Sequence, residues 1–394
     1  MNIQPSQRVS ALPPYLFAEV DRKKRELKAQ GKDVIDLGVG DPDIPTPPFI
    51  IDALARGVAD PENHRYALDA GMPSFRKTIA SWFQARFGVK LDQDKEILPL
   101  IGSKEGIAHL PLALLNPGDV SLIPDPGYPV YHSASMFAGA TTVRMPLLEA
   151  NGFLPDLSQI DKQTLKKAKL LYINYPNNPT SAVAGRECFE ELVSYAKQYE
   201  FVIAQDAAYS EIGFDGYKAP SILEVDGAKE VAIEFHSLSK TFNMTGWRVG
   251  FAAGNPDVVR ALAKIKANVD SGIFQAIQVA GEEALKNGGE WFQKNLKIYE
   301  ARRNRLVQKF ADLGWQFKAP QATFYCWIPV PPGYTSAELA LKFLEEMNIV
   351  VTPGNGFGMH GEGYFRISLT VPEARLDAAL ERIGKSHKHL HAVK

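Results

Sequence analysis

The sequence predicts a two-lobed α/β protein, in which a larger lobe built on a mostly parallel sheet is joined to a smaller α+β lobe. Between about residues 95 and 255, short apolar runs alternate with helix-like stretches, the pattern of strands joined by crossover helices. Near residue 290 the hydrophobic pattern changes, and apolar residues begin to recur at spacings of three and four. The length of 394 residues also exceeds what one hydrophobic core usually covers. We therefore expect a larger lobe at residues 45–285 and a smaller lobe made of residues 1–44 and 286–394.

Apolar runs in the middle of the chain are predicted to form the seven strands of the larger sheet. Each run ends close to Gly, Pro, Asn, Asp or Ser, which favour turns. Ligands of open α/β sheets bind beyond the carboxyl ends of the strands, so the polar residues that follow these runs are candidates for a functional site. The predicted strands are Ile97–Ile101, Val120–Pro124, Thr142–Met145, Leu170–Asn174, Phe201–Gln205, Val231–Phe235 and Arg248–Ala252.

The smaller lobe is predicted from the two ends of the chain. One long amphipathic helix is marked by Phe292, Leu296, Tyr299, Leu306, Phe310 and Leu313. The following patterns predict a strand Thr323–Val330, a helix Ser336–Met347, strands Ile349–Thr352 and Tyr364–Leu369, and a last helix from Pro372. At the other end, we expect a helix at Tyr15–Gln30 and a strand at Val34–Leu37, which pack with this lobe.

Composition and charge argue against several classes of protein. The formal net charge is -1 and no long run has one sign, so nothing indicates nucleic acid or an anionic membrane as a partner. No segment has the roughly eighteen apolar residues of a membrane span, and the charged N-terminal region does not match a secretory signal. Cys188 and Cys326 are too few for a disulfide framework, and no Cys or His cluster suggests a metal site. We therefore expect a cytoplasmic enzyme without a metal.

The most informative motif is the run Ser237-Leu-Ser-Lys240-Thr-Phe-Asn-Met-Thr-Gly-Trp-Arg248. Its lysine follows the predicted strand Val231–Phe235, and a lysine amine can form a Schiff base with an aldehyde cofactor. The hydroxyl of Ser237 and the guanidinium of Arg248 suit the phosphate of such a cofactor. A lone lysine is most often a solvated surface cation, so this interpretation depends on the other loops.

Two loops carry groups suited to a phosphate and to a phenolic oxygen. The turn Gly102-Ser103-Lys104-Glu-Gly106 leads into an apolar helix, whose free backbone N–H groups and dipole favour a phosphate. The alternative is a glycine turn with no ligand. The segment Asn174-Tyr-Pro-Asn-Asn178-Pro-Thr follows another predicted strand, and asparagine can donate a hydrogen bond to a phenolate-like oxygen. The alternative there is a simple Pro/Asn turn.

Three further positions offer a carboxylate, an aromatic face and a guanidinium. Asp206 follows the strand Phe201–Gln205 and would be costly to bury unless it met a cation. That cation could be a protonated pyridine ring, which Tyr209 could also contact, or it could belong to a structural ion pair. Tyr128 could stack on a flat heterocycle or belong to the core. Arg366 lies in an apolar strand, where it suits a substrate carboxylate or a salt bridge between elements.

Together, these motifs resemble the pyridoxal-phosphate enzymes of fold type I, specifically the class I/II aminotransferases. The resemblance runs from Gly38-Val-Gly40-Asp-Pro-Asp43 to Arg366, nearly the full length of the chain. The Ser237-x-x-Lys240…Arg248 signature is highly specific for this family. The resemblance implies the α/β fold of type I, with a mostly parallel seven-stranded sheet between helices and a smaller α+β domain. It also implies pyridoxal 5'-phosphate as cofactor and a homodimer with shared active sites.

The same resemblance implies a role for each motif residue. Lys240 would carry the cofactor and then move the substrate's proton, and it would share the catalytic role with Asp206 and Tyr209. Tyr66 resembles the tyrosine that reaches the phosphate of the neighbouring subunit, and Arg366 resembles the clamp on the substrate α-carboxylate. The implied cofactor-binding residues are Tyr66, Ser103, Lys104, Tyr128, Asn178, Asp206, Tyr209, Ser237, Lys240 and Arg248. The implied substrate-binding residues are Tyr15, Gly40, Lys104, Tyr128, Asn178 and Arg366.

Within the family, the chain is most similar to the LL-diaminopimelate aminotransferases. Tyr15 and Gly40 match residues of their substrate pocket, whereas Ser181 stands where many relatives have glycine. The contact to the distal end of the substrate from the neighbouring subunit falls among Asn268, Asp270 and Ser271. The implied function is transamination between LL-2,6-diaminopimelate and 2-oxoglutarate in lysine biosynthesis. The alternatives are an aminotransferase for alanine, glutamate or aspartate, a pyridoxal-phosphate-dependent C–S lyase, and a non-catalytic binding protein.

Overall fold

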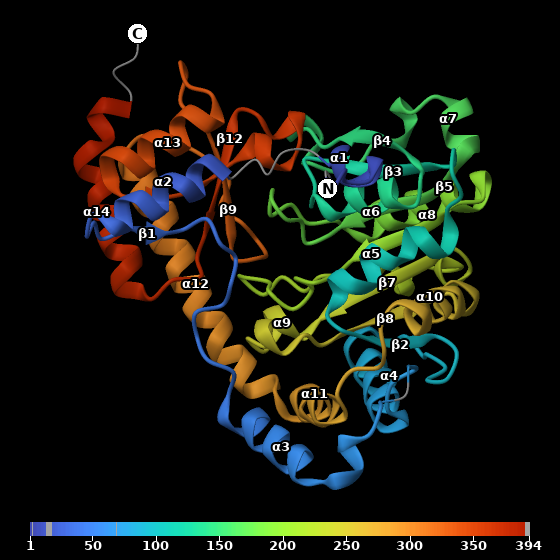
Figure 1. Cartoon of the computed structure of the whole chain (residues 1–394). Coiled ribbons are helices and arrows are strands. Elements are labelled where there is room, and N and C mark those ends of the chain that lie inside the picture. The colour runs from blue at the N-terminus through green and yellow to red at the C-terminus, as the bar shows by residue number, and fades with distance from the viewer. Residues whose placement is uncertain (2, 13–17, 68, 391–394) are drawn as a thin grey trace.

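A seven-stranded sheet forms the centre of the larger lobe in this computed structural model (Figure 1). All neighbouring strands are parallel except β8, which runs antiparallel to both of its neighbours. In spatial order the strands are β2 (Ile97–Leu100), β8 (Gly250–Gly254), β7 (Ala232–Ser237), β6 (Val202–Asp206), β5 (Ala168–Asn174), β3 (Val120–Asp125) and β4 (Thr141–Pro146). The structure describes residues 1, 3–12, 18–67 and 69–390. The predicted mostly parallel sheet is confirmed.

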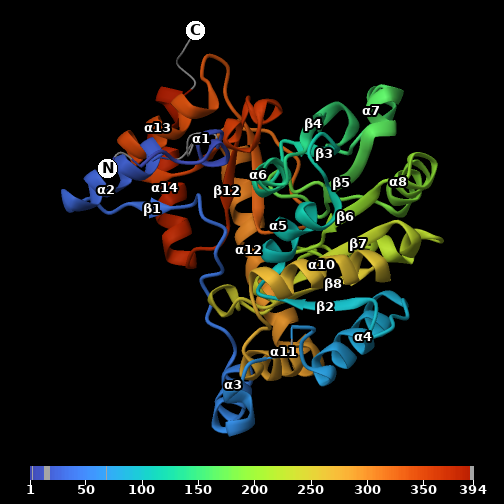
Figure 2. The same cartoon turned by 45° about the vertical axis from the view of Figure 1, so that its right-hand side comes forward.

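Helices cover both faces of this sheet (Figure 2). The reason is visible in β5, where Leu170 and Tyr172 belong to one apolar core and Leu171 and Ile173 to the other. Successive residues of a strand point to opposite faces, so a strand that is apolar throughout must be covered twice. One face packs against α5 (Ser103–Leu114), α6 (Val130–Phe137) and α10 (Pro256–Val269). The other face packs against α4 (Pro73–Phe87), α8 (Arg186–Tyr199) and α11 (Gln275–Asn287).

The smaller lobe is built on two small sheets. Its antiparallel sheet has the order β11 (Thr352–Pro353), β12 (Tyr364–Ser368), β9 (Tyr325–Pro329), and its parallel pair joins β1 (Ile35–Asp36) to β10 (Ile349–Val350). Around them lie α2 (Ala18–Ala29), α12 (Gly289–Asp312), α13 (Ser336–Met347) and α14 (Glu373–Leu390). The side chains of Val20 and Leu27 on α2 share one apolar cluster with Leu344 and Val350. The predicted packing of the N-terminal segment against the C-terminal lobe is therefore confirmed.

The structure corrects two predicted strands. Arg248 does not begin a strand, because it has a φ of 58° and follows the 3₁₀ turn Thr245–Trp247, and β8 starts only at Gly250. The predicted strand Ile349–Thr352 is divided between β10 and β11, which pair in different sheets. The lobe boundaries at residues 44/45 and 285/286 remain a prediction. The remaining described α-helices are α1 (Gln7–Ser10), α3 (Pro48–Ala59), α7 (Lys162–Lys167) and α9 (Leu238–Thr241).

Across the described ranges, no helix combines the length and the apolar character needed to cross a membrane.

Candidate active site

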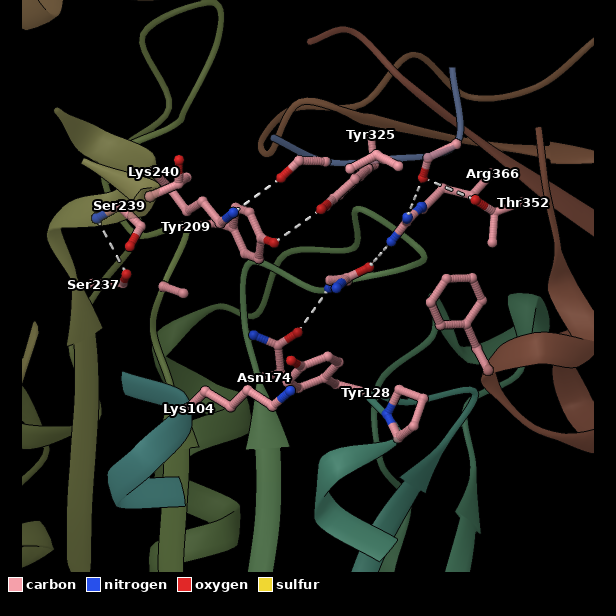
Figure 3. Close-up of a pocket in the computed structure, with 18 of the residues that line it drawn as sticks. Lys104, Tyr128, Asn174, Tyr209, Ser237, Ser239, Lys240, Tyr325, Thr352 and Arg366 are labelled. Carbon is pink, nitrogen blue, oxygen red and sulfur yellow. Dashed lines mark hydrogen bonds between the residues drawn. The ribbon is translucent and has the colours of Figure 1, made fainter. Parts of the chain in front are cut away.

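A pocket of about 630 Å³ opens where the carboxyl ends of the parallel strands face the smaller lobe (Figure 3). The strand β2 is parallel to β7 because β8 runs antiparallel to both, so the loop after β2 reaches this edge as well. Arg248 reaches it from the start of β8, which runs the other way. The predicted site residues that line the pocket are Gly40, Ser103, Lys104, Tyr128, Asn178, Asp206, Tyr209, Ser237, Lys240, Arg248 and Arg366.

Two predicted residues are not part of this lining. Tyr66 lies at the surface with a relative exposure of 94% and is absent from the pocket wall. Its expected contact is with a neighbouring subunit, which remains a prediction. Tyr15 lies outside the described residues.

The glycine turn places the beginning of α5 at one end of the pocket. Gly102 has a φ of 76°, and a Cβ at this position would lie 2.5 Å from Arg248 Nη2, so only glycine lets the guanidinium approach. Arg248 Nη1 donates to the carbonyl of Thr245 at 3.0 Å. No side chain caps the first turn of α5, so its backbone N–H groups are available to an anion. This end of the pocket thus combines a guanidinium with a helix N-terminus.

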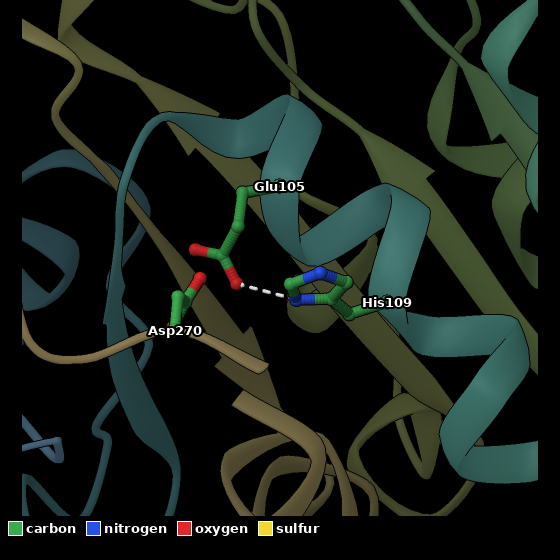
Figure 4. A group of neighbouring side chains, drawn as sticks. All are labelled: Glu105, His109 and Asp270. Carbon is green, nitrogen blue, oxygen red and sulfur yellow. Dashed lines mark hydrogen bonds and ion pairs between the residues drawn. The ribbon is translucent and has the colours of Figure 1, made fainter. Parts of the chain in front are cut away.

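Behind this turn, a network of polar and charged side chains anchors α5 (Figure 4). Glu105 Oε2 accepts the N–H of Ile101 at 2.9 Å and lies 3.3 Å from Lys266 Nζ, while Glu105 Oε1 lies 2.9 Å from His109 Nδ1. Lys266 is fully buried and also donates to Asp270 Oδ1 at 2.8 Å. Burial alone would raise the pKa of Glu105, but these partners bring it below its usual value. Although Glu105, His109 and Asp270 are residue types that bind metals, the Lys266 ammonium already pairs with both carboxylates.

Lys240 extends into the pocket from α9, the short helix that directly follows β7 (Figure 3). Its Nζ donates to the backbone carbonyl of Gly40 at 2.9 Å. Ser237 is the last residue of β7, and its hydroxyl accepts the N–H of Ser239 at 3.3 Å. The amine is therefore held by a neutral carbonyl, which a reaction partner can replace.

Asp206 is buried at the end of β6 without a cationic hydrogen-bond partner among the described residues. Its Oδ2 accepts the hydroxyl of Tyr131 at 2.8 Å, and its Oδ1 accepts the N–H of Ala208 at 3.3 Å. Burial raises the pKa of Asp206 to about 6, although the bond from Tyr131 acts in the opposite direction. The structural ion pair considered as an alternative is thus not formed here. A ligand that brought a positive charge to this carboxylate would be bound favourably.

The loop after β5 is held in place by Asn174. Its Nδ2 donates to the carbonyl of Asp206 at 2.6 Å, and its Oδ1 accepts the N–H of Asn178 at 2.7 Å. These bonds couple the ends of two neighbouring strands and direct Asn178 to the pocket. The segment is therefore more than a turn between elements.

Two tyrosines of the larger lobe present neutral hydroxyls. Tyr209 Oη lies 3.1 Å from Tyr325 Oη, and burial, reinforced by Tyr325, raises the pKa of Tyr209 well above its usual value. Burial, with Asp206 nearby, raises the pKa of Tyr128 to about 12. Both phenols therefore stay protonated near neutral pH and can donate a hydrogen bond to a ligand.

Arg366 carries a buried positive charge that no carboxylate of the described residues neutralises. Its relative exposure is 7%, and its guanidinium lies 4.0 Å from the centroid of the Tyr325 ring and 4.8 Å from that of Phe357. Nη1 donates to Asn178 Oδ1 at 2.5 Å and Nη2 to the carbonyl of Gly38 at 2.8 Å. The salt bridge between elements that was the alternative is not formed in the described part of the chain. A planar anion would supply the missing charge.

Several residues of this site were not predicted from the sequence. Tyr325 and Phe357 pack on Arg366, Gly38 accepts one of its hydrogen bonds, and Tyr131 donates to Asp206. Tyr325 begins a strand that is apolar and almost entirely buried, so no local signal distinguishes it from its neighbours. For Phe357, the preceding Gly354-Asn-Gly could have indicated a close approach between backbones.

One pocket combines the amine of Lys240, the buried carboxylate of Asp206, a site at the start of α5 that suits a phosphate, and the guanidinium of Arg366. Such a set can bind an anionic ring with a protonated nitrogen and, next to it, a second molecule with a carboxylate. The amine of Lys240 lies among these groups and can serve as nucleophile or base.

Comparisons with known proteins agree with this description. The family model described as "Aminotransferase class I and II" matches residues 32–383. An LL-diaminopimelate aminotransferase of Moorella thermoacetica is 52% identical over 97% of this chain and 98% of its own length. One of Aquifex aeolicus is 55% identical over 96% and 98%. Among solved structures, substrate-bound BacF from Bacillus subtilis superposes with a TM-score of 0.94 at 38% identity, with 98% of each chain covered. The chain therefore belongs to the class I and II aminotransferases.

Proposed function

We propose that this aminotransferase uses pyridoxal 5'-phosphate to transfer an amino group from LL-2,6-diaminopimelate to 2-oxoglutarate, a step of lysine biosynthesis. The observation that supports this cofactor is the presence, in one pocket, of the Lys240 amine and the buried Asp206 carboxylate, which has no cationic hydrogen-bond partner among the described residues. The support for the substrate comes from relatives such as those of Moorella thermoacetica and Aquifex aeolicus, which have this activity in their names.

The residues of the pocket fit the cofactor at both of its ends. The N-terminus of α5 at Ser103 and Lys104, the hydroxyl of Ser237 and the guanidinium of Arg248 would hold the phosphate. Asp206 would meet the protonated ring nitrogen, since a buried carboxylate whose pKa is raised by burial gains from a nearby cation.

The faces and the phenolic oxygen of the ring also find suitable groups. Tyr128 would stack on the ring, and Tyr209 and Asn178 would donate hydrogen bonds to its phenolic oxygen. When bound, pyridoxal phosphate supplies an aldehyde that bonds to amines and an electron-poor ring that stabilises a carbanion beside it.

Lys240 would bond to the cofactor and, once the substrate amine has displaced it, act as the base. Its Nζ has only the Gly40 carbonyl as a hydrogen-bond partner among the described residues, so no carboxylate holds its proton. The freed amine would take the α-proton of the substrate and return it to the former aldehyde carbon of the cofactor. The same amine thus performs both proton transfers.

Arg366 would bind the α-carboxylate of the amino acid and of the keto acid. Its partners, Asn178 Oδ1 and the Gly38 carbonyl, are neutral acceptors, and a carboxylate would form a stronger, charge-assisted pair. The stacked rings of Tyr325 and Phe357 exclude water from the guanidinium faces and fix its plane. The substrate would thereby be oriented relative to Lys240.

A homodimer in the cytoplasm, with active sites shared between subunits, completes the proposal. Exposed apolar side chains gather near the chain segment 51–66 and the start of α11, namely those of Ile51, Val58, Tyr66 and Phe274. The helices α3 and α11 pack together, and Gln275 Nε2 donates to the carbonyl of Glu62 at 3.0 Å. Such a surface favours a protein partner, and in a dimer Tyr66 would reach the phosphate of the other subunit.

The first test is whether the purified chain binds the cofactor through a lysine. After incubation with pyridoxal phosphate, we expect an absorbance in the visible range, and borohydride should fix the cofactor covalently on Lys240, as a tryptic peptide map would show. Protein that stays colourless and unmodified would contradict the proposal.

The second test is a comparison of amino donors. Initial rates with 2-oxoglutarate should give the highest kcat/KM for LL-diaminopimelate, above alanine and aspartate, with glutamate tested against pyruvate. Faster reaction of alanine or aspartate would contradict LL-diaminopimelate as the preferred amino donor but would still support transamination. Release of pyruvate and ammonia from cystathionine without any keto acid would indicate a C–S lyase instead.

A further inference from the structure

The loop between β11 and β12 carries the aromatic ring that covers Arg366. It consists of two 3₁₀ turns, Gly354–Phe357 and Met359–Gly361. The Phe357 ring lies over the guanidinium and makes an edge contact to Trp327 with centroids 6.0 Å apart. Any shift of this loop would therefore move one wall of the proposed carboxylate site.

Two hydrogen bonds attach this loop to the end of β3 in the other lobe. The N–H of Gly127 donates to the carbonyl of Phe357 at 2.9 Å. The N–H of His360 donates to Asp125 Oδ1 at 3.2 Å. Asp125 is the last residue of β3, so the attachment joins the larger sheet to the loop that carries Phe357.

Asp125 is fully buried and lies between a side chain of each lobe, Arg144 in the larger sheet and His360 in the smaller lobe. Its Oδ2 lies 3.3 Å from His360 Nδ1 and 3.6 Å from Arg144 Nη1. Arg144 belongs to β4 in the larger sheet, whereas His360 comes from the smaller lobe. Because a buried carboxylate requires polar partners, the backbone N–H of His360 and the imidazole beside it favour the arrangement in which the two lobes are in contact at this point.

The backbone of the loop is shaped to receive this carboxylate. Gly358 has a φ of 136°, and a Cβ on it would lie 1.9 Å from Asp125 Oδ1. No other residue type could occupy the position without displacing the carboxylate. Neither Asp125 nor His360 lines the pocket itself, so any influence on the substrate must pass through the loop.

We propose that Asp125 and His360 form an interlobe latch that holds Phe357 over Arg366 and thereby sets the affinity of the site for substrate carboxylates. Both are positioning residues: they act on Arg366 through the Gly354–Gly361 loop and touch no substrate. The part that concerns substrate rests on the proposed function, because it takes Arg366 as the carboxylate clamp. The latch itself does not depend on it.

The kinetic test compares His360→Ala and Asp125→Asn with Met359→Ala as matched control. Met359 precedes His360 in the same turn, but its side chain is 72% exposed. Loss of the latch should raise KM for LL-diaminopimelate and for 2-oxoglutarate about three- to thirty-fold, the range expected when one aromatic contact to a cation is weakened. The value of kcat should stay within about twofold, since Lys240 and Asp206 are untouched. A fall in kcat with unchanged KM would overturn the proposal.

Hydrogen exchange of the backbone provides a readout that does not depend on activity. In the pyridoxal-phosphate-loaded protein, amides of residues 354–361 should exchange at least about threefold faster in His360→Ala and Asp125→Asn than in the parent protein. Met359→Ala should leave them unchanged. Equal exchange in all four proteins would refute the latch. Faster exchange together with unchanged KM would refute its link to the substrate site. If the two variants exchange faster than the parent protein but the parent protein transaminates no amino acid, the proposed function fails and the latch remains supported.

A double variant tests whether the latch acts through Phe357. If it does, His360→Ala should add little to the rise in KM that Phe357→Leu already causes, because the ring it positions is gone. Fully multiplicative effects of the two changes would contradict this route. His360 is partly exposed, so its replacement decides the case even if Asp125→Asn fails to fold.

Discussion

Lys266 and Arg366 are both buried cations, but their surroundings differ in kind. Lys266 is bonded to Glu105 and Asp270 and lies outside the pocket. Arg366 lines the pocket and, in the described part of the chain, is hydrogen-bonded only to an amide oxygen and a carbonyl. The same contrast separates two carboxylates. The partly buried Glu105 has Lys266 as its counter-charge, whereas the buried Asp206 has, among the described residues, only the neutral hydroxyl of Tyr131 and a backbone N–H as hydrogen-bond partners.

The difference teaches how to separate structural from functional charges in this chain. A buried charge costs free energy unless it is neutralised. Where the protein supplies the opposite charge itself, as around Lys266, the group stabilises the fold. Where it does not, as at Arg366 and Asp206, the fold tolerates a cost that a bound ligand can offset.

The largest effect is expected for Lys240→Ala, which removes the amine of the pocket. Turnover should fall by at least about 10⁴-fold, because nucleophile and base are lost together, and borohydride should no longer attach the cofactor. Lys264→Ala serves as control, since Lys264 is exposed on α10, and should leave both signals as they are. Residual activity of more than a few per cent in a preparation free of wild-type protein would speak against Lys240 as the reactive amine.

Lys266→Met should be the most destabilising of the charge changes. It leaves the partly buried carboxylates of Glu105 and Asp270 without their cation, and the loss should not exceed the about 3–5 kcal/mol of unfolding free energy that breaking a fully buried pair costs. Urea denaturation of the cofactor-free protein would measure the change. Lys294→Met is the matched control, because Lys294 pairs with Glu290 on α12 and both side chains are exposed, and it should change stability by less than about 1 kcal/mol. Similar free energies of unfolding for the two variants would contradict the stabilising role of the Lys266 charge.

Arg366→Ala should affect substrate binding far more than folding. We expect kcat/KM to fall about 10³-fold, mainly through KM, because the charge-assisted pair with the carboxylate is lost. Cofactor attachment should persist. In Arg305→Ala, which removes an exposed pair with Asp377, steady-state kinetics should match those of the parent protein. An Arg366→Ala enzyme with an unchanged KM would remove the assignment of the clamp.

The smallest change in stability is expected for the cofactor-free Asp206→Asn protein, and it depends on pH. Burial raises the pKa of Asp206 from 3.8 to about 6, so folding takes up a proton at this group. Its favourable contribution is complete below about pH 4 and is lost as the pH rises through about 6. Above about pH 6, the free energy of unfolding of the cofactor-free Asp206→Asn protein should exceed that of the wild type by no more than about 3 kcal/mol.

The stability difference should shrink as the pH falls from 7 to 4 and should reverse in sign when pyridoxal phosphate is added, because wild type alone then gains an ionic partner for the ring. Thermal unfolding at several pH values would measure both effects. Asp226→Asn, an exposed change, should show no such dependence. A pH-independent offset for Asp206→Asn would mean that the carboxylate is not desolvated in solution.

Much of the larger lobe's contribution to the pocket could be predicted from the sequence for one physical reason. In a parallel sheet the residues that follow each strand meet at one edge, so Ser103, Tyr128, Asn178, Asp206 and Lys240 could be grouped before their distances were known. Arg366 could be predicted because a charge within an apolar strand requires a partner.

The other parts of the site have no such local signal. Tyr325 and Phe357 are ordinary apolar positions in their own segments, and they become part of the site only because β9 and the loop after β11 pack on Arg366. The latch between Asp125 and His360 joins residues 235 positions apart. The roles of Tyr15 and Tyr66 remain predictions that depend on the family resemblance.

The hydrogen bond from Arg366 to Gly38 spans 328 positions of the sequence, and this has a consequence for biosynthesis. On the ribosome, the N-terminal wall of the pocket emerges early and must wait for almost the whole polypeptide before its counterpart is made. A nascent chain that ends before β12 contains the residues proposed to hold the phosphate but lacks Arg366, the residue proposed to select the substrate. Selection of an amino acid would thus be the last property of the pocket to be completed during synthesis.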